Sequence, residues 1–503
     1  MPPDPAAAEP LPAVDEPSSI GGLGGHPRGL NTLFFTELWE RFSYYGMRAV
    51  LILYMTSSVA SGGMGMTAAQ AAPIYGLYTG GVYFTAIPGG WIADKLLGLQ
   101  RAVLAGGILI ALGHYSLALN SRPMFYTGLV LIVLGTGLLK PNVSSIVGQL
   151  YKPEDTRRDA GFSIFYMGIN LGAWISPLIV GFMAQDPRFL AWLARLGIHS
   201  QFGWHWGFGA AGLGMTLGVF WFLRGRRHLG RAGRDVASPS DNPAGTWALL
   251  ALVLLAATAL LWALWPYKDY VVLAGTAAFF WWLARQAQDA VERKRTYALI
   301  VLFVFATLFW AGFEQAGSSL NLFADRYTRT SILGWEYPPS WLQAVNAMFI
   351  WMLAPVFAWI WIRLGRHEPS SPAKFAYGLL NVGLGFLAVA WAAKLSLDAG
   401  GARVSVMWLI AVYLFHTIGE LCLSPVGLST VTKLAPSRLV GSMMGVWFLA
   451  LSLGNFIGGR VAGLFETFPL PQLFGAVFLT TAGSALVLAL LVRPISKLMG
   501  GVR

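Results

Sequence analysis

The 503-residue chain is 56% hydrophobic but only 12% charged, and its formal net charge is +12. Soluble domains carry about 25% charged residues, so this composition excludes a secreted, nucleic-acid-binding or ordinary cytosolic protein and indicates an integral membrane protein. Cytoplasmic loops of membrane proteins collect Lys and Arg, so the positive charge requires no nucleic-acid partner. The single cysteine, Cys422, excludes an intramolecular disulfide and a multi-cysteine metal or iron–sulfur site.

Apolar stretches long enough to cross a bilayer recur along the chain, at about 20 residues for each crossing. Residues 1–29, rich in Pro, Ala and Gly, contain no signal-peptide core and are predicted to form a disordered tail. The sequence therefore predicts an all-α integral membrane protein with about fourteen spans. These centre near residues 31–57, 71–94, 101–119, 124–150, 160–184, 204–224, 246–265, 269–288, 297–318, 341–363, 375–395, 404–431, 440–462 and 471–493.

A faint repeat relates the first six stretches to the last six. Lys140-Pro141 and Ser424-Pro425 stand at matching positions, and a Gly-rich apolar helix follows each. Two parallel six-helix bundles with sites at their interface are a transporter plan, of the major-facilitator type. The predicted divisions are the tail 1–29, an N-terminal bundle 30–225, a basic cytoplasmic linker 226–245, an inserted helical hairpin 246–290, a C-terminal bundle 296–495 and a tail 496–503.

The distribution of positive charge between loops predicts the orientation in the membrane. With the N-terminus inside, roughly 22 Lys and Arg fall on the inner side and 8 on the outer side. The inner side includes the basic segment Arg224, Arg226, Arg227, Arg231 and Arg234. We therefore expect a multi-pass protein of the plasma membrane with both termini in the cytoplasm.

Charged residues also occur inside the apolar stretches, at Glu37, Glu40, Arg41, Arg48, Lys140, Glu314 and Glu420. Seven unpaired charges at the bilayer centre would cost roughly 20 kcal/mol, so they must pair or face water and therefore line an interior. Two simpler interpretations remain open. The first three could be interfacial charges at a helix start. Lys140, before Pro141, could extend from a kinked helix to the interface.

These seven residues comprise four carboxylates and three cations, so one added proton would neutralise the set. A desolvated carboxylate with a mobile cationic partner is a natural proton site, which favours a proton-coupled device. Glu420 follows Gly419 and precedes Ser424-Pro425, a pattern that predicts a locally broken helix lining a binding cavity. Tyr83, Asn170, Asn346 and Trp447 are weaker candidates, since each could simply join helices together.

No phosphate-binding loop, nucleophile elbow or metal motif occurs in the sequence, which argues against an ATP-driven pump or an enzyme. We expect no cofactor.

Several motifs resemble those of the proton-dependent oligopeptide transporter family, in its bacterial branch. Glu37-x-x-Glu40-Arg41-Phe42-x-Tyr44-Tyr45-Gly46 is similar to the family's first-helix motif, and Phe165 to Gly172 to its fifth-helix signature. Gly90 to Arg101 resembles the loop motif of the wider major facilitator superfamily. Phe309-Trp310 to Gln315 and Gly419-Glu420 to Leu428 resemble the seventh and tenth helices. The resemblance runs in order from about residue 31 to 495.

The resemblance implies a proton-coupled importer of di- and tripeptides that works by alternating access, as a monomer in the lipid bilayer of a bacterial plasma membrane. Arg41 and Lys140 are expected to bind the peptide carboxylate, and Glu420 and Asn346 its amino group. The other residues expected to contact substrate are Tyr45, Tyr83, Asn170, Trp310, Glu314, Ser424 and Trp447. Proton coupling is expected at Glu37, Glu40, Arg41, Arg48, Lys140 and Glu314.

One departure from the family pattern narrows this expectation. Animal members carry a histidine after a tyrosine in the second helix, where this chain has Gly76 after Tyr75. Proton coupling is therefore expected to rest on carboxylates. The alternative function is proton-coupled import of another small solute, such as nitrate or a peptide-like drug.

Overall fold

The structure is a computed structural model that describes residues 21–152, 155–236, 239–252, 267–332, 334–435 and 440–500. Regular structure in these ranges is almost entirely helical, as the composition predicts. Nine of the described helices are long and apolar enough to span a membrane. The predicted number of fourteen stays a prediction. Residues 253–266 of the expected hairpin lie outside the described ranges, and the first helix, although continuous, carries several charged residues within its apolar run.

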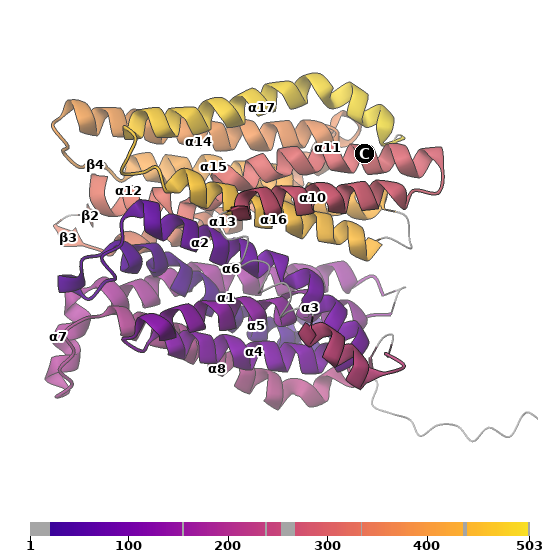
Figure 1. The fold of residues 1–503 in the computed structure, drawn as a ribbon, viewed down its shortest axis with the longest axis horizontal. Coiled ribbons are helices and arrows are strands. Elements are labelled where there is room, and N and C mark those ends of the chain that lie inside the picture. The colour runs from indigo at the N-terminus through magenta and orange to yellow at the C-terminus, as the bar shows by residue number, and fades with distance from the viewer. Residues whose placement is uncertain are drawn as a thin grey trace, which may run out of the picture.

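The first six predicted stretches form one group of packed helices. The second stretch is divided at Thr85 into two helices, and a π-helical turn, Ala93–Leu97, follows it. Figure 1 shows this group in indigo to magenta. Its helices are α1 (Arg28–Thr56), α2 (Ala68–Phe84), α3 (Ala86–Ile92), α4 (Leu99–Leu117), α5 (Arg122–Gln149), α6 (Arg158–Gln185) and α8 (Trp204–Gly225).

The last six predicted stretches form a second group, which lies beside the first (Figure 1). Short strands join its loops: β1 (Thr328–Arg329) pairs in parallel with β4 (Val404–Ser405), and β2 (Ser331–Ile332) pairs antiparallel with β3 (Trp335–Glu336). Its helices are α11 (Ala290–Phe313), α12 (Ser319–Tyr327), α13 (Ala344–Leu364), α14 (Ser371–Asp398), α15 (Met407–Leu434), α16 (Val440–Ala462) and α17 (Leu470–Leu498).

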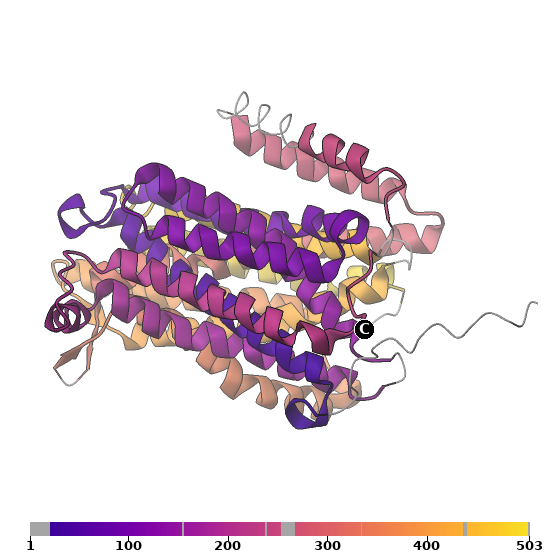
Figure 2. The same ribbon diagram turned by 90° about the horizontal axis from the view of Figure 1, so that it is seen from below.

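Three further helices lie outside the two groups. The short helix α7 (Pro187–Arg195), which the sequence analysis did not predict, lies at the opposite end of the molecule from the C-terminus (Figure 1). A helix over Pro243–Leu252 and α10 (Lys268–Arg285) belong to the predicted hairpin. Figure 2 shows α10 alongside the two groups rather than within them. It contacts α11, where the rings of Phe280 and Phe303 lie 4.5 Å apart.

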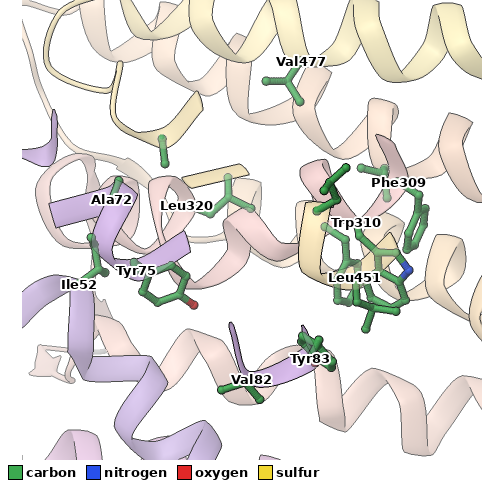
Figure 3. Packing of buried hydrophobic residues seen from close by; sticks show 14 of the residues in the cluster. Ile52, Ala72, Tyr75, Val82, Tyr83, Phe309, Trp310, Leu320, Leu451 and Val477 are labelled. Atoms are coloured by element: carbon green, nitrogen blue, oxygen red, sulfur yellow. The ribbon is translucent and has the colours of Figure 1, made fainter. Parts of the chain in front are cut away.

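The two groups meet chiefly where α2 packs on α16 and α6 packs on α13. Glycines permit the first of these contacts, because a Cβ added at Gly76 would lie 2.9 Å from the Cα of Gly459. Side chains of both groups then share one apolar core. Figure 3 shows Tyr75, Val82 and Tyr83 of α2 in the same cluster as Trp310 of α11 and Leu451 of α16.

Two local predictions are corrected by the structure. The break expected near Pro425 is absent, since α15 runs unbroken from Met407 to Leu434. The chain breaks instead in the predicted 297–318 stretch, where α11 ends at Phe313 and a 3₁₀ turn, Glu314–Gly317, precedes α12. The predicted tail is also ordered at its end: His26 is buried and its Nδ1 lies 2.8 Å from the Tyr151 hydroxyl. Residues 1–20 and 501–503 of the two predicted tails lie outside the described ranges.

Candidate substrate and proton site

Three charged residues of α1 form a buried cluster in the first group. Glu37, Glu40 and Arg41 are each at most 3% exposed. The Arg41 Nε lies 3.1 Å from Glu37 Oε1 and also donates a hydrogen bond to Glu40. The i,i+4 spacing places the Glu37 carboxylate beside the guanidinium, and Glu40, the residue directly before Arg41, contacts it as well. The cluster lies inside the protein, so the interfacial interpretation of these three charges does not apply.

Several polar atoms of this cluster have no hydrogen-bond partner among the described residues. Glu37 Oε2, Glu40 Oε1 and Arg41 Nη2 are buried and make no hydrogen bond to the part of the chain that the structure describes. Buried polar atoms without partners are costly, and most are explained by a functional role or an unseen partner. Two free carboxylate oxygens beside one guanidinium can accept a proton, while the free guanidinium nitrogen can donate to an anion.

Lys140 on α5 lies close to the same cluster. It acts electrostatically on Glu37 and is itself affected by Arg41 and Glu40. The Lys140 Nζ stands 4.0 Å from the centre of the Tyr83 ring, a cation–π distance. Within the described ranges no carboxylate pairs with it at ion-pair distance, and it is half-buried. This inward position on α5 contradicts extension of the side chain to the membrane interface.

A second charged site joins the two groups. Arg48 of α1 forms an ion pair with Glu314, at the end of α11, with its Nη2 2.6 Å from Glu314 Oε2. The Arg48 Nε donates a hydrogen bond of 2.7 Å to the Tyr75 hydroxyl on α2. Both charged side chains are almost fully buried. The break after Phe313 turns the chain at Glu314, so the carboxylate reaches Arg48 across the interface.

Gly317 lies directly against this ion pair. A Cβ at this position would stand 1.7 Å from the Tyr75 hydroxyl and 2.9 Å from Arg48 Nε. Gly317→Ala should therefore separate α2 from the α11–α12 turn and lower the melting temperature of the purified protein by several degrees, since overpacking costs about 1–3 kcal/mol. Gly475→Ala is the matched control, because a Cβ there meets nothing within 4 Å. Equal melting temperatures for the two variants would contradict this close contact.

The second group contributes the predicted carboxylate for an amino group. The Asn346 side chain on α13 donates to Glu420 Oε2 on α15 at 3.1 Å and lies 2.9 Å from the Thr417 hydroxyl. Glu420 and Asn346 are half-buried, whereas the carboxylates Glu37 and Glu40 of α1 are almost fully buried. The Tyr45 ring of α1 lies near two of the cations, with its centre 6.0 Å from Arg41 Cζ and 5.8 Å from Arg48 Cζ.

The remaining predicted residues are less closely gathered. Trp310 and Trp447 meet edge to face with ring centres 6.2 Å apart, within the shared apolar core, and their role as pocket walls stays a prediction. Asn170 is buried and donates to the Tyr166 backbone oxygen in its own helix, and Ser424 is half-buried on α15. A small apolar cavity adjoins Trp447, but its lining from α11, α14, α15 and α16 includes none of the predicted charged residues.

One end of the interface, away from the C-terminus, is closed by polar contacts between the groups. Glu466, after α16, accepts a hydrogen bond of 2.9 Å from the Ala68 N–H of α2 and pairs with Arg326 at 2.6 Å. Burial raises the pKa of Glu466, but the bonds from Arg326 and Ala68 outweigh it and hold that pKa below the usual value. The Asn321 side chain donates to the Ala49 oxygen at 2.7 Å, and Arg188 donates to the Glu336 oxygen at 3.0 Å.

Three residues of this region were missed by the sequence analysis: Tyr75, Thr417 and Tyr166. Tyr75 accepts a hydrogen bond from Arg48, Thr417 accepts one from Asn346, and the Tyr166 backbone oxygen accepts one from Asn170. Each lies about one helical turn from a predicted residue on the same helix, or contacts a predicted residue on another helix. A search for hydroxyls at helical spacing from the intramembrane charges would have found Thr417, three residues before Glu420.

Comparison with known proteins places the chain among transporters. The POT family profile matches residues 100–477. The chain is 43% identical to the peptide transporter YePEPT of Yersinia enterocolitica, over 95% of this chain and 96% of that protein. It is 37% identical to a di-/tripeptide transporter of Lactococcus lactis subsp. cremoris, over 95% and 98%. A crystal structure of a mutant peptide transporter POT in complex with alafosfalin superposes with a TM-score of 0.86 at 40% identity, covering 97% of this chain and 99% of that one. The chain therefore belongs to the POT family of membrane transporters.

Proposed function

We propose that this protein is a proton-coupled symporter that imports di- and tripeptides by alternating access. The peptide carboxylate binds Arg41 and Lys140, and the peptide amino group binds Glu420 and Asn346. Tyr45, Tyr83, Asn170 and Ser424 contact the peptide, while Trp310 and Trp447 wall its side chains. Protons move through Glu37, Glu40 and Glu314. The names of similar proteins, a peptide transporter and a di-/tripeptide transporter, support this substrate class.

The observation that carries the proposal is the division of the intramembrane charges between the two helix groups. Arg41 and Lys140 belong to the first group, and Glu420 belongs to the second. A dipeptide in extended form separates its charged termini by roughly 7 Å, at about 3.3–3.6 Å per residue. In the proposed arrangement a zwitterion of that length bridges the two sets, and its side chains vary against the aromatic walls.

Proton coupling follows from the way in which the cations share partners. Arg41 is engaged by Glu37 and Glu40 in the structure. A peptide carboxylate that takes Arg41 leaves those two carboxylates facing each other without their cation, and protonation of one relieves the repulsion. Inward proton movement supplies about 2.3 kcal/mol per 100 mV, enough for roughly fiftyfold accumulation of a neutral zwitterion.

Alternating access requires the closed end of the interface to open. The Arg48–Glu314 ion pair crosses that interface and must separate as the two groups move. Protonation of Glu314 weakens this pair, so opening of the interface is coupled to proton binding. We place this end outside the cell, in a bacterial plasma membrane with both termini in the cytoplasm, because of the charge bias of the loops. All residues in the proposed pathway come from one chain, so a monomer suffices.

Blocking either terminus of a dipeptide tests this arrangement. N-acetyl-dialanine lacks the cation for Glu420, and dialanine amide lacks the anion for Arg41 and Lys140. Hydrogen bonds to charged groups contribute about 1.5–3 kcal/mol, so each blocked compound should compete at least about tenfold more weakly than dialanine for labelled dialanine uptake. Free alanine serves as the control for length. Equal competition by all four compounds would overturn the two-ended clamp.

A further inference from the structure

The proposed transport mechanism gives no role to the basic segment at the end of α8, and the sequence explains it only as an orientation signal. In the structure this segment is held firmly rather than free. The Gln100 side chain, 2% exposed, donates to the Ala232 oxygen at 2.8 Å. The Gly233 N–H in turn donates to the Gln149 side chain at 2.7 Å, and Leu229 is fully buried. Helices α4 and α5 therefore fix the backbone of residues 229–233, which the sequence analysis described as part of a linker.

The arginines of this segment are displayed outward. Arg224, Arg227, Arg231 and Arg234 are exposed, while Arg226 turns inward and donates to Gln100 at 2.9 Å. Arg28 joins them, because the neighbouring Gly29 packs against the His228 backbone oxygen. Within the described ranges none of the four exposed arginines has an ion-pair partner. A fixed backbone thus presents a dense patch of unneutralised positive charge.

The arginine patch adjoins the exposed apolar faces of α4 and α8. Leu213, Leu217 and Phe220 of α8 are 57%, 38% and 57% exposed, and at 100° per residue they share a face about 60° wide with Arg224. On α4 the exposed residues Ile108, Leu112 and Tyr115 share a face with Arg101 in the same way. The two faces adjoin, because the Tyr115 hydroxyl lies 2.8 Å from the Thr216 hydroxyl, and Figure 1 shows α4 next to α8.

Two adjacent apolar stripes that each end in an arginine match the outline of a phospholipid. A phospholipid whose acyl chains followed these stripes would place its phosphate beside Arg101 and Arg224. Arginine suits that phosphate, because its planar guanidinium donates two parallel hydrogen bonds. From this juxtaposition we propose that the α4–α8 seam and the arginine patch behind it (Arg224, Arg227, Arg231 and Arg234) bind the headgroup of an anionic phospholipid of the inner leaflet.

Native mass spectrometry of the full-length protein with phosphatidylglycerol or phosphatidylcholine tests the proposal. Wild type should retain phosphatidylglycerol in preference to phosphatidylcholine. Retention of phosphatidylglycerol by R224Q/R227Q should be at least about tenfold lower, because each basic residue near an anionic surface raises the affinity about fivefold. R293Q/K294Q is the matched control: it removes two exposed charges at the start of α11 and should retain the lipid like wild type. Soluble glycerol phosphate should not displace the lipid.

Three results would overturn the proposal. They are equal retention of the two lipids by wild type, equal loss from both double variants, and displacement by glycerol phosphate, which would mean an anion site without need for a membrane. Both variants are first shown to share the wild-type melting temperature, so a loss of lipid cannot be a loss of fold. Because lipid retention is read without peptide or proton gradient, the outcome is independent of the proposed transport function.

Discussion

Glu314→Gln is expected to abolish proton-driven peptide accumulation while sparing peptide counterflow. Gln keeps the shape of Glu314 and a hydrogen-bond acceptor for Arg48, whose Nη2 lies 2.6 Å from the carboxylate, but it carries no charge at any pH. The gate can then still open and close around a bound peptide, while its equilibrium no longer responds to a proton. Uptake of labelled dialanine into liposomes under an imposed inward proton gradient should fall at least about tenfold, to the level without a gradient, if the gradient supplies the roughly fiftyfold accumulation.

The matched control for this experiment is Glu336→Gln, which neutralises an exposed carboxylate on β3. It should accumulate dialanine like wild type. Removing one charge of a buried pair can destabilise a protein by about 3–5 kcal/mol, so the counterflow measurement also serves to prove that Glu314→Gln is folded. Gradient-driven accumulation that persists in Glu314→Gln would exclude this carboxylate from coupling.

Lys140→Ala is expected to impair both dipeptide binding and driven transport. Lys140 is the cation of the first group that stands against an aromatic ring rather than a carboxylate, with its Nζ 4.0 Å from the Tyr83 ring centre. It is therefore the cation most readily available to a peptide carboxylate. Loss of a charge-assisted contact of about 1.5–3 kcal/mol predicts an affinity for dialanine that is roughly tenfold to a hundredfold weaker, as measured by calorimetry on the purified protein.

Two variants separate this role of Lys140 from general loss of charge. Lys294→Ala removes an exposed lysine of α11 and should leave affinity unchanged. Tyr83→Phe keeps the ring beneath Lys140 and should weaken binding less than Lys140→Ala, since only the hydroxyl is lost. Wild-type affinity for dialanine in Lys140→Ala would place the peptide carboxylate elsewhere.

The interior position of the intramembrane charges could be predicted from sequence, because a charged side chain in an apolar helix must pair with another charge or face water. Helical spacing alone places Glu37, Glu40 and Arg41 on one face of one helix, and the structure pairs them there. Partners on different helices, such as Arg48 with Glu314, do not follow from spacing within one helix. Tyr75 was missed, because no periodic pattern records which side chains meet when α2 packs against α1.

The position of the helix break also lay beyond local sequence rules. Pro425 removes a backbone donor, yet α15 continues through it, as membrane helices often do when neighbouring groups satisfy the freed carbonyl. The actual break at Glu314–Gly317 contains no proline, and its Gly317 lies close to Tyr75 and Arg48, which belong to other helices. The fixed backbone of residues 229–233 likewise depends on Gln100 and Gln149, two buried amides distant in sequence.

The most direct test of the central claim is uptake of labelled dialanine by the purified protein in liposomes, with and without an imposed inward proton gradient. The account predicts gradient-dependent accumulation that other dipeptides compete away and free alanine does not. An absence of uptake by folded protein, with both orientations present in the membrane, would contradict proton-coupled dipeptide transport and leave only the family and the fold.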